Sequence, residues 1–280
     1  MSITVGNMNS TSPLFYSDLE RHIRRDKRLT VHLAGHSLEL DLSFKHERAY
    51  AAKLILNLRH PQSDLDEFLF KRFVKPGDTV LDAGANIGFA TSQMLSAGAS
   101  RVIALEPVPE LFERLRQLNA GTVVALDKAL SSNSGKASLI LSKAHNQGSS
   151  LNPIMLTLFP NVFAGTNQTI NVDLTTIDDI ALEYGPLDVW KLDVEGAEVA
   201  ALRGATQTLK NAPPRAIIVE LYPPFLDEFL SLATARHSFV YRAFIRQDPY
   251  ELVLAPWKTE IGAEFCNTSP MYVFTSEEQT

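Results

Sequence analysis

The sequence Thr79-Val80-Leu81-Asp82-Ala83-Gly84-Ala85-Asn86-Ile87-Gly88 decides the fold of this 280-residue chain. Its first half is a short apolar run bounded by turn residues, which predicts a buried strand of a parallel sheet. Gly84 and Gly88 then bracket a turn, and the residues from Phe89 to Leu95 have a pattern compatible with a helix. A glycine loop of this kind presents free backbone N–H groups at a helix N-terminus. In open α/β sheets it lies in the crevice at the carboxyl ends of the strands, where ligands bind.

A second buried strand, Arg101–Leu105, ends in Glu106 and Pro107. An acid at this place can accept hydrogen bonds from both hydroxyls of a ribose. Asp82 ends the first strand, and we expect its carboxylate to face the crevice. The glycine spacing is G-x-x-x-G and lacks the G-x-G-x-x-G pattern of a pyrophosphate cradle. A nucleoside without phosphates therefore fits this loop better than a dinucleotide.

A third informative stretch is the predicted strand Leu187–Asp193, which is followed by Val194-Glu195-Gly196-Ala197-Glu198. The strand end places Asp193 and Glu195 at the crevice edge that also holds the two acids described above. Four acids at one edge repel one another, so a structural role alone explains them poorly. A bound sulfonium cation would relieve part of that cost.

These motifs resemble those of class I S-adenosylmethionine methyltransferases of the FkbM type. The resemblance is carried by Asp82-Ala-Gly-Ala-Asn-Ile-Gly88, by Glu106-Pro107 and by Lys191-Leu-Asp-Val-Glu-Gly-Ala-Glu198. It implies an α/β fold with a doubly wound, mostly parallel seven-stranded sheet, the Rossmann-like methyltransferase fold, whose last strand is antiparallel. It also implies S-adenosylmethionine as cofactor and O-methylation of a hydroxyl, on a glycan sugar or on a polyketide-like natural product.

The residues expected to bind the cofactor lie in the glycine loop and at the ends of the strands. They are Asp82, Gly84, Ala85, Asn86, Gly88, Glu106, Pro107, Asp127 and Asp193. Asp127 follows the predicted strand Val123–Leu126, and in the family this strand end lies beside the adenine. Asp127 can accept from the adenine amino group there, but the family more often has an amide near this place, and an exposed turn acid explains the residue nearly as well.

Methyl transfer from a sulfonium is a one-step displacement, so positioning supplies much of the acceleration. A base is needed only as an acceptor hydroxyl loses its proton. The best candidates are Asp193 and Glu195, with Glu198, Glu220 and the loop residue His145 behind them. Asp193 can instead orient the methionine moiety, which leaves Glu195 to face the acceptor. We predict no metal site, because no His or Cys pair stands at ligand spacing near these acids.

The chain is 45% apolar, which is enough to bury a substantial core. We predict an N-terminal extension over residues 1–62 and a methyltransferase domain over residues 63–280. The extension should contain a helix over Leu14–Lys27 and a β-hairpin of Thr30–Leu33 and Leu38–Leu42, which we expect to cap the main sheet. Periodicity also predicts helices over Ser63–Val74 and Glu110–Asn119 and a threonine-capped helix after Thr176. It predicts strands over Ala137–Leu141 and Ala216–Val219. Two further strands, Phe239–Phe244 and Met271–Phe274, are expected to form an antiparallel pair.

The net charge of −6 and the lack of a basic patch argue against a nucleic-acid partner. The basic run Arg21–Arg28 is interpreted as a solvated helix face. No charged-then-apolar leader and no apolar run near 18 residues are present, so we expect a cytoplasmic enzyme without a signal peptide or a membrane span. The single cysteine, Cys266, excludes an intrachain disulfide. The sequence does not predict an oligomeric state.

The long segment His145–Gly165, together with the N-terminal hairpin, is expected to roof the crevice. It mixes polar side chains with Phe159 and Phe163, a combination that suits a hydroxyl-rich ring. We therefore favour a sugar hydroxyl as acceptor over a macrolide, which would prefer a more continuous apolar wall. Two other classes fit the sequence less well: a nicotinamide oxidoreductase should show the G-x-G-x-x-G loop, and a non-catalytic nucleoside-binding module would not need acids at several strand ends.

Overall fold

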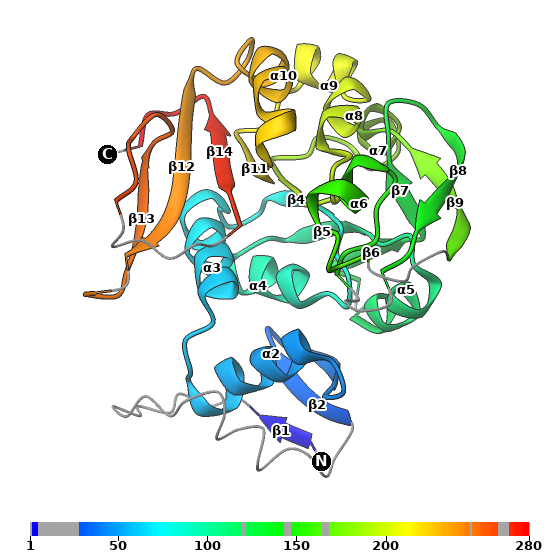
Figure 1. Cartoon of the computed structure of the whole chain (residues 1–280), viewed down its shortest axis with the longest axis vertical. Helices are drawn as coiled ribbons and strands as arrows, with labels where there is room; N and C mark the ends of the chain where they lie inside the picture. Colours follow the sequence, from blue (N-terminus) through cyan, green and yellow to red (C-terminus); the bar gives the residue numbers. More distant parts are fainter. Residues whose placement is uncertain are drawn as a thin grey trace.

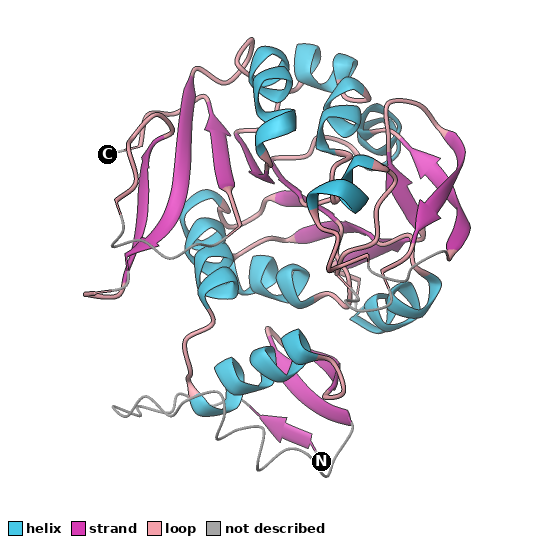
Figure 2. Ribbon diagram, viewed as in Figure 1, coloured by secondary structure: helices cyan, strands magenta, loops and turns pink. Residues whose placement is uncertain are grey.

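The computed structural model describes residues 2–4, 28–118, 121–142, 147–163, 168–246, 248–262 and 269–279, and the structural statements below concern these residues. Figures 1 and 2 show a central sheet with helices on both faces, a small second sheet, and an N-terminal extension beside the main body. The helix predicted over residues 14–27 and the base candidate His145 lie outside the described residues.

Eight strands form the central sheet, in the order β13-β12-β14-β11-β10-β4-β5-β6. Five of them run parallel: β4 (Thr79–Ala83), β5 (Arg101–Leu105), β6 (Val123–Leu126), β10 (Val189–Leu192) and β11 (Ala216–Glu220). The other three pair antiparallel at one side of the sheet: β12 (Phe239–Arg246), β13 (Glu251–Pro256) and β14 (Met271–Thr275). The predicted doubly wound, mostly parallel sheet with an antiparallel closing pair is confirmed.

The sheet has one strand more than the seven that were predicted, and the additional strand is β13. It lies at the edge of the sheet and pairs only with β12. None of its residues is fully buried: its ends are exposed and its middle is half-buried. A strand without one buried face shows no clear alternation of apolar and polar residues, so periodicity does not reveal it.

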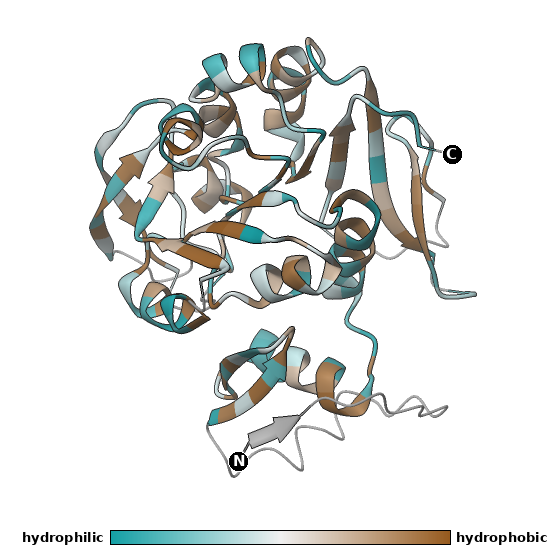
Figure 3. Ribbon diagram, turned by 180° about the vertical axis from the view of Figure 1, so that it is seen from behind, coloured by the Kyte–Doolittle hydropathy of each residue, from teal (hydrophilic) through white to brown (hydrophobic). Residues whose placement is uncertain are grey.

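Helices cover both faces of the sheet, so the parallel strands are buried on both sides. Val189 of β10 belongs to the hydrophobic cluster shared with α3 (Pro61–Phe73) and α4 (Phe89–Ala97), whereas Trp190 belongs to the cluster on the other face. Figure 3 shows the apolar residues concentrated along the strands. The helices on the second face, which lie above the sheet in Figure 1, are α7 (Ile177–Tyr184), α8 (Glu198–Arg203), α9 (Thr206–Asn211) and α10 (Pro223–Ala233).

Capping groups set where α3 begins. The helix starts two residues before the predicted Ser63, because Pro61 can occupy the first turn without losing a backbone hydrogen bond. His60 is the N-cap, and its ring Nδ1 accepts a hydrogen bond from the Ser63 N–H at 3.2 Å.

At α7 the predicted threonine cap is confirmed, since the Thr176 hydroxyl oxygen accepts from the Asp179 N–H at 3.0 Å.

A second, three-stranded sheet lies where the sequence predicted mainly a loop with one strand. Its order is β7-β9-β8, and beyond β8 an isolated bridge between Ile140 and Ser150 folds the chain back. The segment expected to be irregular thus contains regular elements as well. The elements between β5 and α7 are α5 (Pro109–Leu115), a 3₁₀ turn (Arg116–Leu118), β6, β7 (Lys128–Leu130), β8 (Gly135–Ile140), α6 (Ile154–Leu158) and β9 (Thr169–Thr175).

The N-terminal extension consists of β1 (Ser2–Thr4), the predicted hairpin of β2 (Arg28–Leu33) and β3 (His36–Asp41), and α2 (Lys45–Leu56). The buried leucines and valine of the hairpin belong to the same hydrophobic cluster as α3 and α4. Outside the extension the hairpin packs mainly on α4 and on the 3₁₀ turn Arg116–Leu118. Because the cluster is continuous, the division of the chain at residue 62 stays a prediction.

A buried ion pair joins the extension to α5. Glu47 of α2 has a fully buried side chain, and both of its oxygens accept hydrogen bonds from the guanidinium of Arg114, at 2.9 and 2.5 Å. The Asp41 N–H donates to the same carboxylate at 2.6 Å. Removing one partner of such a pair leaves the other charge buried without compensation.

We predict that Glu47→Ala lowers the free energy of unfolding by about 3–5 kcal/mol, the usual cost of breaking a buried ion pair. Urea denaturation measures the change. Arg28→Ala is the matched control, because Arg28 pairs with Glu39 on the same hairpin but its side chain is 60% exposed. The control should cost less than about 1 kcal/mol, and equal losses for the two variants would contradict the prediction.

Candidate active site

The glycine loop after β4 is shaped by close backbone contact between neighbouring strand ends. Gly84 has a φ of +76°, and a Cβ added to it would lie 1.9 Å from the carbonyl oxygen of Asp193, at the end of β10. The N–H groups of Gly84 and Ala85 donate to the carbonyl of Leu105, at 3.1 and 2.9 Å. A side chain at Gly84 would thus separate the two strand ends that form the site.

Gly88 is required for packing. Its φ is +87°, and a Cβ there would lie 2.1 Å from the side chain of Leu118 in the 3₁₀ turn. Gly88 lines neither of the two cavities at this edge of the sheet, whereas Gly84 and Asn86 line both. The structure therefore explains Gly88 without a ligand contact.

Glu106 is held rigidly at the end of β5. One of its oxygens accepts from the Asn86 N–H at 3.0 Å and the other from the Val108 N–H at 2.8 Å. Burial raises the pKa of Glu106 to about 7, although these backbone donors and Lys191 act in the opposite direction. Each carboxylate oxygen keeps one lone pair for a further donor, so the position predicted for ribose binding is sterically and chemically suitable.

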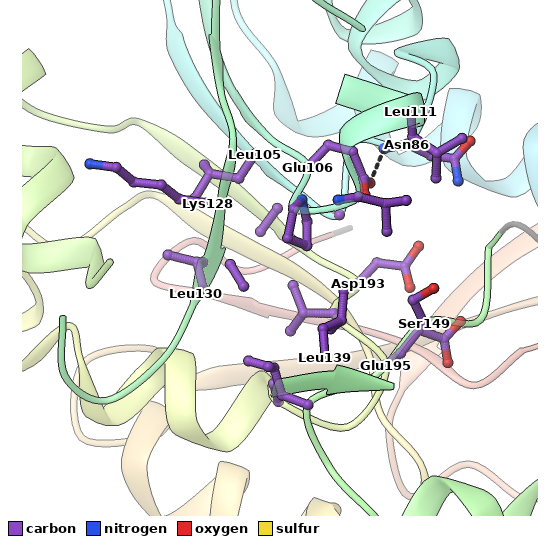
Figure 4. A pocket seen from close by; sticks show the side chains of 18 of the residues that line it. Asn86, Leu105, Glu106, Leu111, Lys128, Leu130, Leu139, Ser149, Asp193 and Glu195 are labelled. Carbon is purple, nitrogen blue, oxygen red and sulfur yellow. Dashed lines mark hydrogen bonds between the residues drawn. The ribbon is translucent and has the colours of Figure 1, made fainter. Parts of the chain in front are cut away.

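The first cavity runs from the glycine loop along the ends of β5 and β7. The empty space within it is about 690 Å³, a volume that includes open solvent. Figure 4 shows the carboxylates of Glu106, Asp193 and Glu195 on the same side of this cavity as Ser149, and Leu130 on the other side. The larger apolar residues of the wall are Leu105, Pro107, Val108, Leu111, Leu130, Leu139, Leu151 and Val194.

Asp82 does not face the crevice as expected. It is completely buried and lines neither cavity. One of its oxygens accepts from the Thr91 hydroxyl at 2.6 Å, and the other lies 3.3 Å from the ammonium of Lys191. Asp82 therefore supports the glycine loop from beneath, and a direct contact with a ligand has no support in this geometry.

Lys191 makes contacts at this site that the sequence interpretation did not predict. Its ammonium is nearly buried, lies 3.3 Å from carboxylate oxygens of both Asp82 and Asp193, and donates to the Gly84 carbonyl at 3.0 Å. Burial alone would lower the pKa of Lys191, but Asp193, Asp82 and Asp66 raise it above its ordinary value. The repulsion expected among the acids is thus partly relieved by a cation within the chain. The available signal was its position two residues before Asp193, on the same side of the strand.

Asp193 and Glu195 line both cavities and stand where the two meet. Glu195 has a φ of +52°, which is uncommon for a residue with a side chain and marks a constrained backbone. The Ser150 hydroxyl donates to the Glu195 carbonyl, and Glu198 accepts from the N–H groups of Val194 and Gly196 at 3.0 and 3.2 Å. The turn is therefore fixed from both sides.

The pKa of Glu195 is raised well above its ordinary value by burial first and then by the charges of Asp193 and Glu220. Lys191 acts against this shift. A raised pKa makes a carboxylate a stronger base toward the proton of a hydroxyl. The two acids one residue apart were predicted from the sequence, and the structure brings both to the junction of the cavities.

The second cavity lies on the other side of the two acids. The predicted aromatic residues Phe159 and Phe163 line it, as does Gln147 from the same segment. No described residue of the hairpin lines it, so the expectation of a hairpin roof is wrong; Tyr50 of α2 takes that place. Its remaining described lining residues are Gln62, Asp66, Gly84, Ala85, Asn86, Ile87, Phe89, Ala90, Gly148, Val162, Lys191, Asp193, Glu195, Glu220, Tyr222 and Ser269.

Asp127 is exposed and lines neither cavity, whereas the next residue, Lys128, lines the first one. The geometry therefore gives the adenine contact predicted for Asp127 no support.

The described residues contain no group of three or more His, Cys, Asp or Glu side chains that could hold a metal ion. Within the same residues, no helix is long and apolar enough to cross a bilayer.

The chain is similar to known proteins in both sequence and structure. A family model for the FkbM methyltransferase domain matches residues 82–246, more than half of the chain. No curated protein matches significantly.

Many solved structures match. A methyltransferase dependent on S-adenosylmethionine from Agrobacterium tumefaciens is 8% identical at a TM-score of 0.45, covering 90% of this chain and 71% of that one. A TehB-like methyltransferase from Corynebacterium glutamicum is 14% identical at a TM-score of 0.43, covering 83% and 96%. With TM-scores below 0.5, these likenesses carry no argument.

Replacing Gly84 tests the contact between the ends of β4 and β10. We predict that Gly84→Ala weakens the binding of S-adenosylhomocysteine at least tenfold, which corresponds to about 1.4 kcal/mol, because the new Cβ displaces the Asp193 backbone. Calorimetry measures the affinity. Gly77→Ala is the control, since Gly77 also has a positive φ, +95°, but has nothing within 4 Å of an added Cβ. The control should cost only stability, roughly 1–2 kcal/mol, and a similar loss of affinity in both variants would argue against the proposed contact.

The raised pKa values of four acids at the site predict how the stability of the protein depends on pH. Burial raises the pKa of Asp66, Glu106 and Glu220 to about 7 and that of Glu198 to about 8. Between pH 6.5 and 8 the folded chain then binds more protons than the unfolded chain, so stability falls as the pH rises. Below pH 6.5 the buried His60, whose pKa burial lowers to about 4, acts in the opposite direction.

We therefore predict that the melting temperature of the cofactor-free protein decreases from pH 6.5 to pH 8 and then levels off. Scanning calorimetry across this range measures it. Glu198→Gln keeps an oxygen acceptor for the two backbone donors but removes one titrating group, so it should flatten the decrease. A melting temperature that rises across the window would show the raised pKa values to be wrong.

Proposed function

Because the chain belongs to the FkbM methyltransferase family, we propose that it transfers the methyl group of S-adenosylmethionine to a hydroxyl of a sugar or glycan. The protein is a methyltransferase that depends on S-adenosylmethionine. We further propose that the nucleophile is an oxygen, that the acceptor is a sugar, and that individual residues have the roles described below. One observation carries the proposal: the acid pair Asp193 and Glu195 stands at the junction of two cavities.

The first cavity suits the nucleoside part of the cofactor. Glu106 can accept from the ribose hydroxyls with the lone pairs that its backbone donors leave free, and Pro107 and Leu130 offer apolar surface for a purine ring. Gly84 has no side chain and so permits the close approach of the methionine part. When bound, S-adenosylmethionine supplies an activated methyl group on a sulfonium.

Asp193 and Glu195 are given different roles by their surroundings. One oxygen of Asp193 faces Lys191 at 3.3 Å, so Asp193 is tied to the strand end and is suited to orient the ammonium of the methionine part. The Glu195 carboxylate has no hydrogen bond to another described residue and has a raised pKa. We assign Glu195 as the base that receives the proton of the acceptor hydroxyl.

The second cavity supports a hydroxyl-rich acceptor. Phe159 and Tyr222 stand edge to face with ring centroids 4.7 Å apart, and polar side chains alternate with such rings around the wall. Apolar sugar faces pack on aromatic rings while hydroxyls need hydrogen-bond partners. A macrolide or other polyketide remains the second candidate, and the acids in the wall count against it because burying them under apolar surface is costly.

Glu195→Gln tests the assignment of the base. We predict that turnover falls about 10²-fold, the usual effect of removing a positioned base, while the affinity for S-adenosylhomocysteine stays nearly unchanged. Asp193→Asn should reduce both turnover and affinity. Methyl transfer to oligosaccharides, nucleotide sugars and macrolides, followed with labelled cofactor, gives turnover, and calorimetry gives affinity.

Glu183→Gln, on the outer surface of α7, is the matched control and should behave as the original protein. Full turnover in both Glu195→Gln and Asp193→Asn would remove the acid pair from the chemistry. Exclusive activity on an apolar polyketide would show the sugar acceptor to be wrong.

A further inference from the structure

Part of the second cavity is formed by residues that precede the region of the family match. Tyr50 comes from α2, and Gln62 and Asp66 come from α3, whereas the match begins at residue 82. Gln62 and Asp66 are four residues apart and therefore lie on one face of the helix. In the part of the chain that the structure describes, neither side chain makes a hydrogen bond or an ion pair. Both polar groups are thus available to a ligand in the cavity.

Tyr50 fixes this wall against the rest of the site. Its ring stacks on Phe89, the first residue of α4, with centroids 3.9 Å apart and an angle of 6° between the planes. Its hydroxyl accepts a hydrogen bond from the Gln147 side chain at 2.8 Å, and Gln147 lines both cavities. The extension is therefore anchored directly beside the glycine loop rather than attached at a distance.

Carboxyl groups predominate among the ionisable side chains of the wall. Four carboxylates line it, those of Asp66, Asp193, Glu195 and Glu220, and they come from α3, the turn after β10, and β11. Among the described lining residues, Lys191 supplies the only side chain that is cationic at neutral pH, and its ammonium is already engaged with two carboxylates and the Gly84 carbonyl. A phosphate, sulfate or carboxylate in this cavity would be desolvated without a counter-charge, which is strongly unfavourable.

We infer that α2 and α3 select the acceptor through Tyr50, Gln62 and Asp66, and that the acceptor is a hydroxyl-rich ring that is uncharged or bears an ammonium. Acceptors with an anionic group on the part that enters the second cavity are excluded. The aromatic rings take the apolar faces of such a ring, and the free carboxylate and amide take its hydroxyl or ammonium donors. This inference rests on the proposed function, because it assumes that the second cavity receives the acceptor.

The charge preference can be measured without an acceptor. Gln62→Cys, made in a Cys266→Ser background, places one thiol in the wall of the second cavity. The protein with S-adenosylhomocysteine bound is treated with two methanethiosulfonates that differ in charge, the trimethylammonium-ethyl and the sulfonato-ethyl reagent. Leu182→Cys in the same background gives the reference ratio of rates, since Leu182 is 88% exposed.

We expect the ratio of the cationic to the anionic rate to be at least about tenfold higher at position 62 than at position 182, as a cavity lined by one sign of charge concentrates counter-ions. Adding Asp66→Asn should bring the ratio at position 62 down severalfold without changing the affinity for S-adenosylhomocysteine. Asp66→Asn keeps the size and a hydrogen-bonding group, so this loss would reflect charge.

A ratio at position 62 equal to or below the reference, or one that Asp66→Asn leaves unchanged, would overturn the inference. A Gln62→Cys protein that does not bind S-adenosylhomocysteine is treated as misfolded. In that case Val162→Cys, on the segment with Phe159 and Phe163, serves as the probe with the same expected ratio. Because no methyl group is transferred in this experiment, an acceptor that is not methylated on oxygen would defeat the proposed function while leaving the measured ratio intact.

Discussion

The site depends on one buried ammonium. Lys191 reaches from the middle of β10 to Asp82 on β4, to Asp193 at its own strand end and to the carbonyl of Gly84. Its charge also opposes the effect of burial, which raises the pKa of Asp66, Glu106 and Glu195 on different elements. Burial disfavours the charged forms of the lysine and of these acids alike, and each charge offsets part of that penalty for the others. The charged groups therefore require one another, and together they fix the edges of three neighbouring strands.

Backbone constraints at the same edge fix the direction in which the acids point. Gly84 allows the ends of β4 and β10 to touch, and the left-handed conformation of Glu195 turns its side chain toward the junction of the cavities. Such a conformation costs roughly 1–3 kcal/mol and persists only where surrounding contacts hold it. Here Glu198 and Ser150 supply those contacts through hydrogen bonds to the turn. Lys191 offsets part of the burial penalty on the charged acids, and the strained turn orients them.

The sequence predicted the parts of this arrangement that depend on local pattern. Buried parallel strands read as apolar runs, and acids directly after them must lie at one edge, so the sequence predicted that Glu106, Asp193 and Glu195 lie together, and all three line the first cavity. The burial of Asp82 was not predictable, because it depends on Lys191 of a neighbouring strand, more than 100 residues later in the chain. Tyr50 was missed for the same reason: its contacts with Phe89 and Gln147 are distant in sequence.

The two cavities differ in how the chain forms them. The first is built from loops at the ends of the parallel strands, so the fold itself positions its polar groups. The second needs α2, α3 and the segment around Phe159 in addition, elements that the sheet does not specify. A chain can therefore change the second cavity by altering its extension while Glu106 and the glycine loop stay in place. Because Tyr50 stacks beside that loop and contacts Gln147, which lines both cavities, such a change is transmitted first to the boundary between the two cavities.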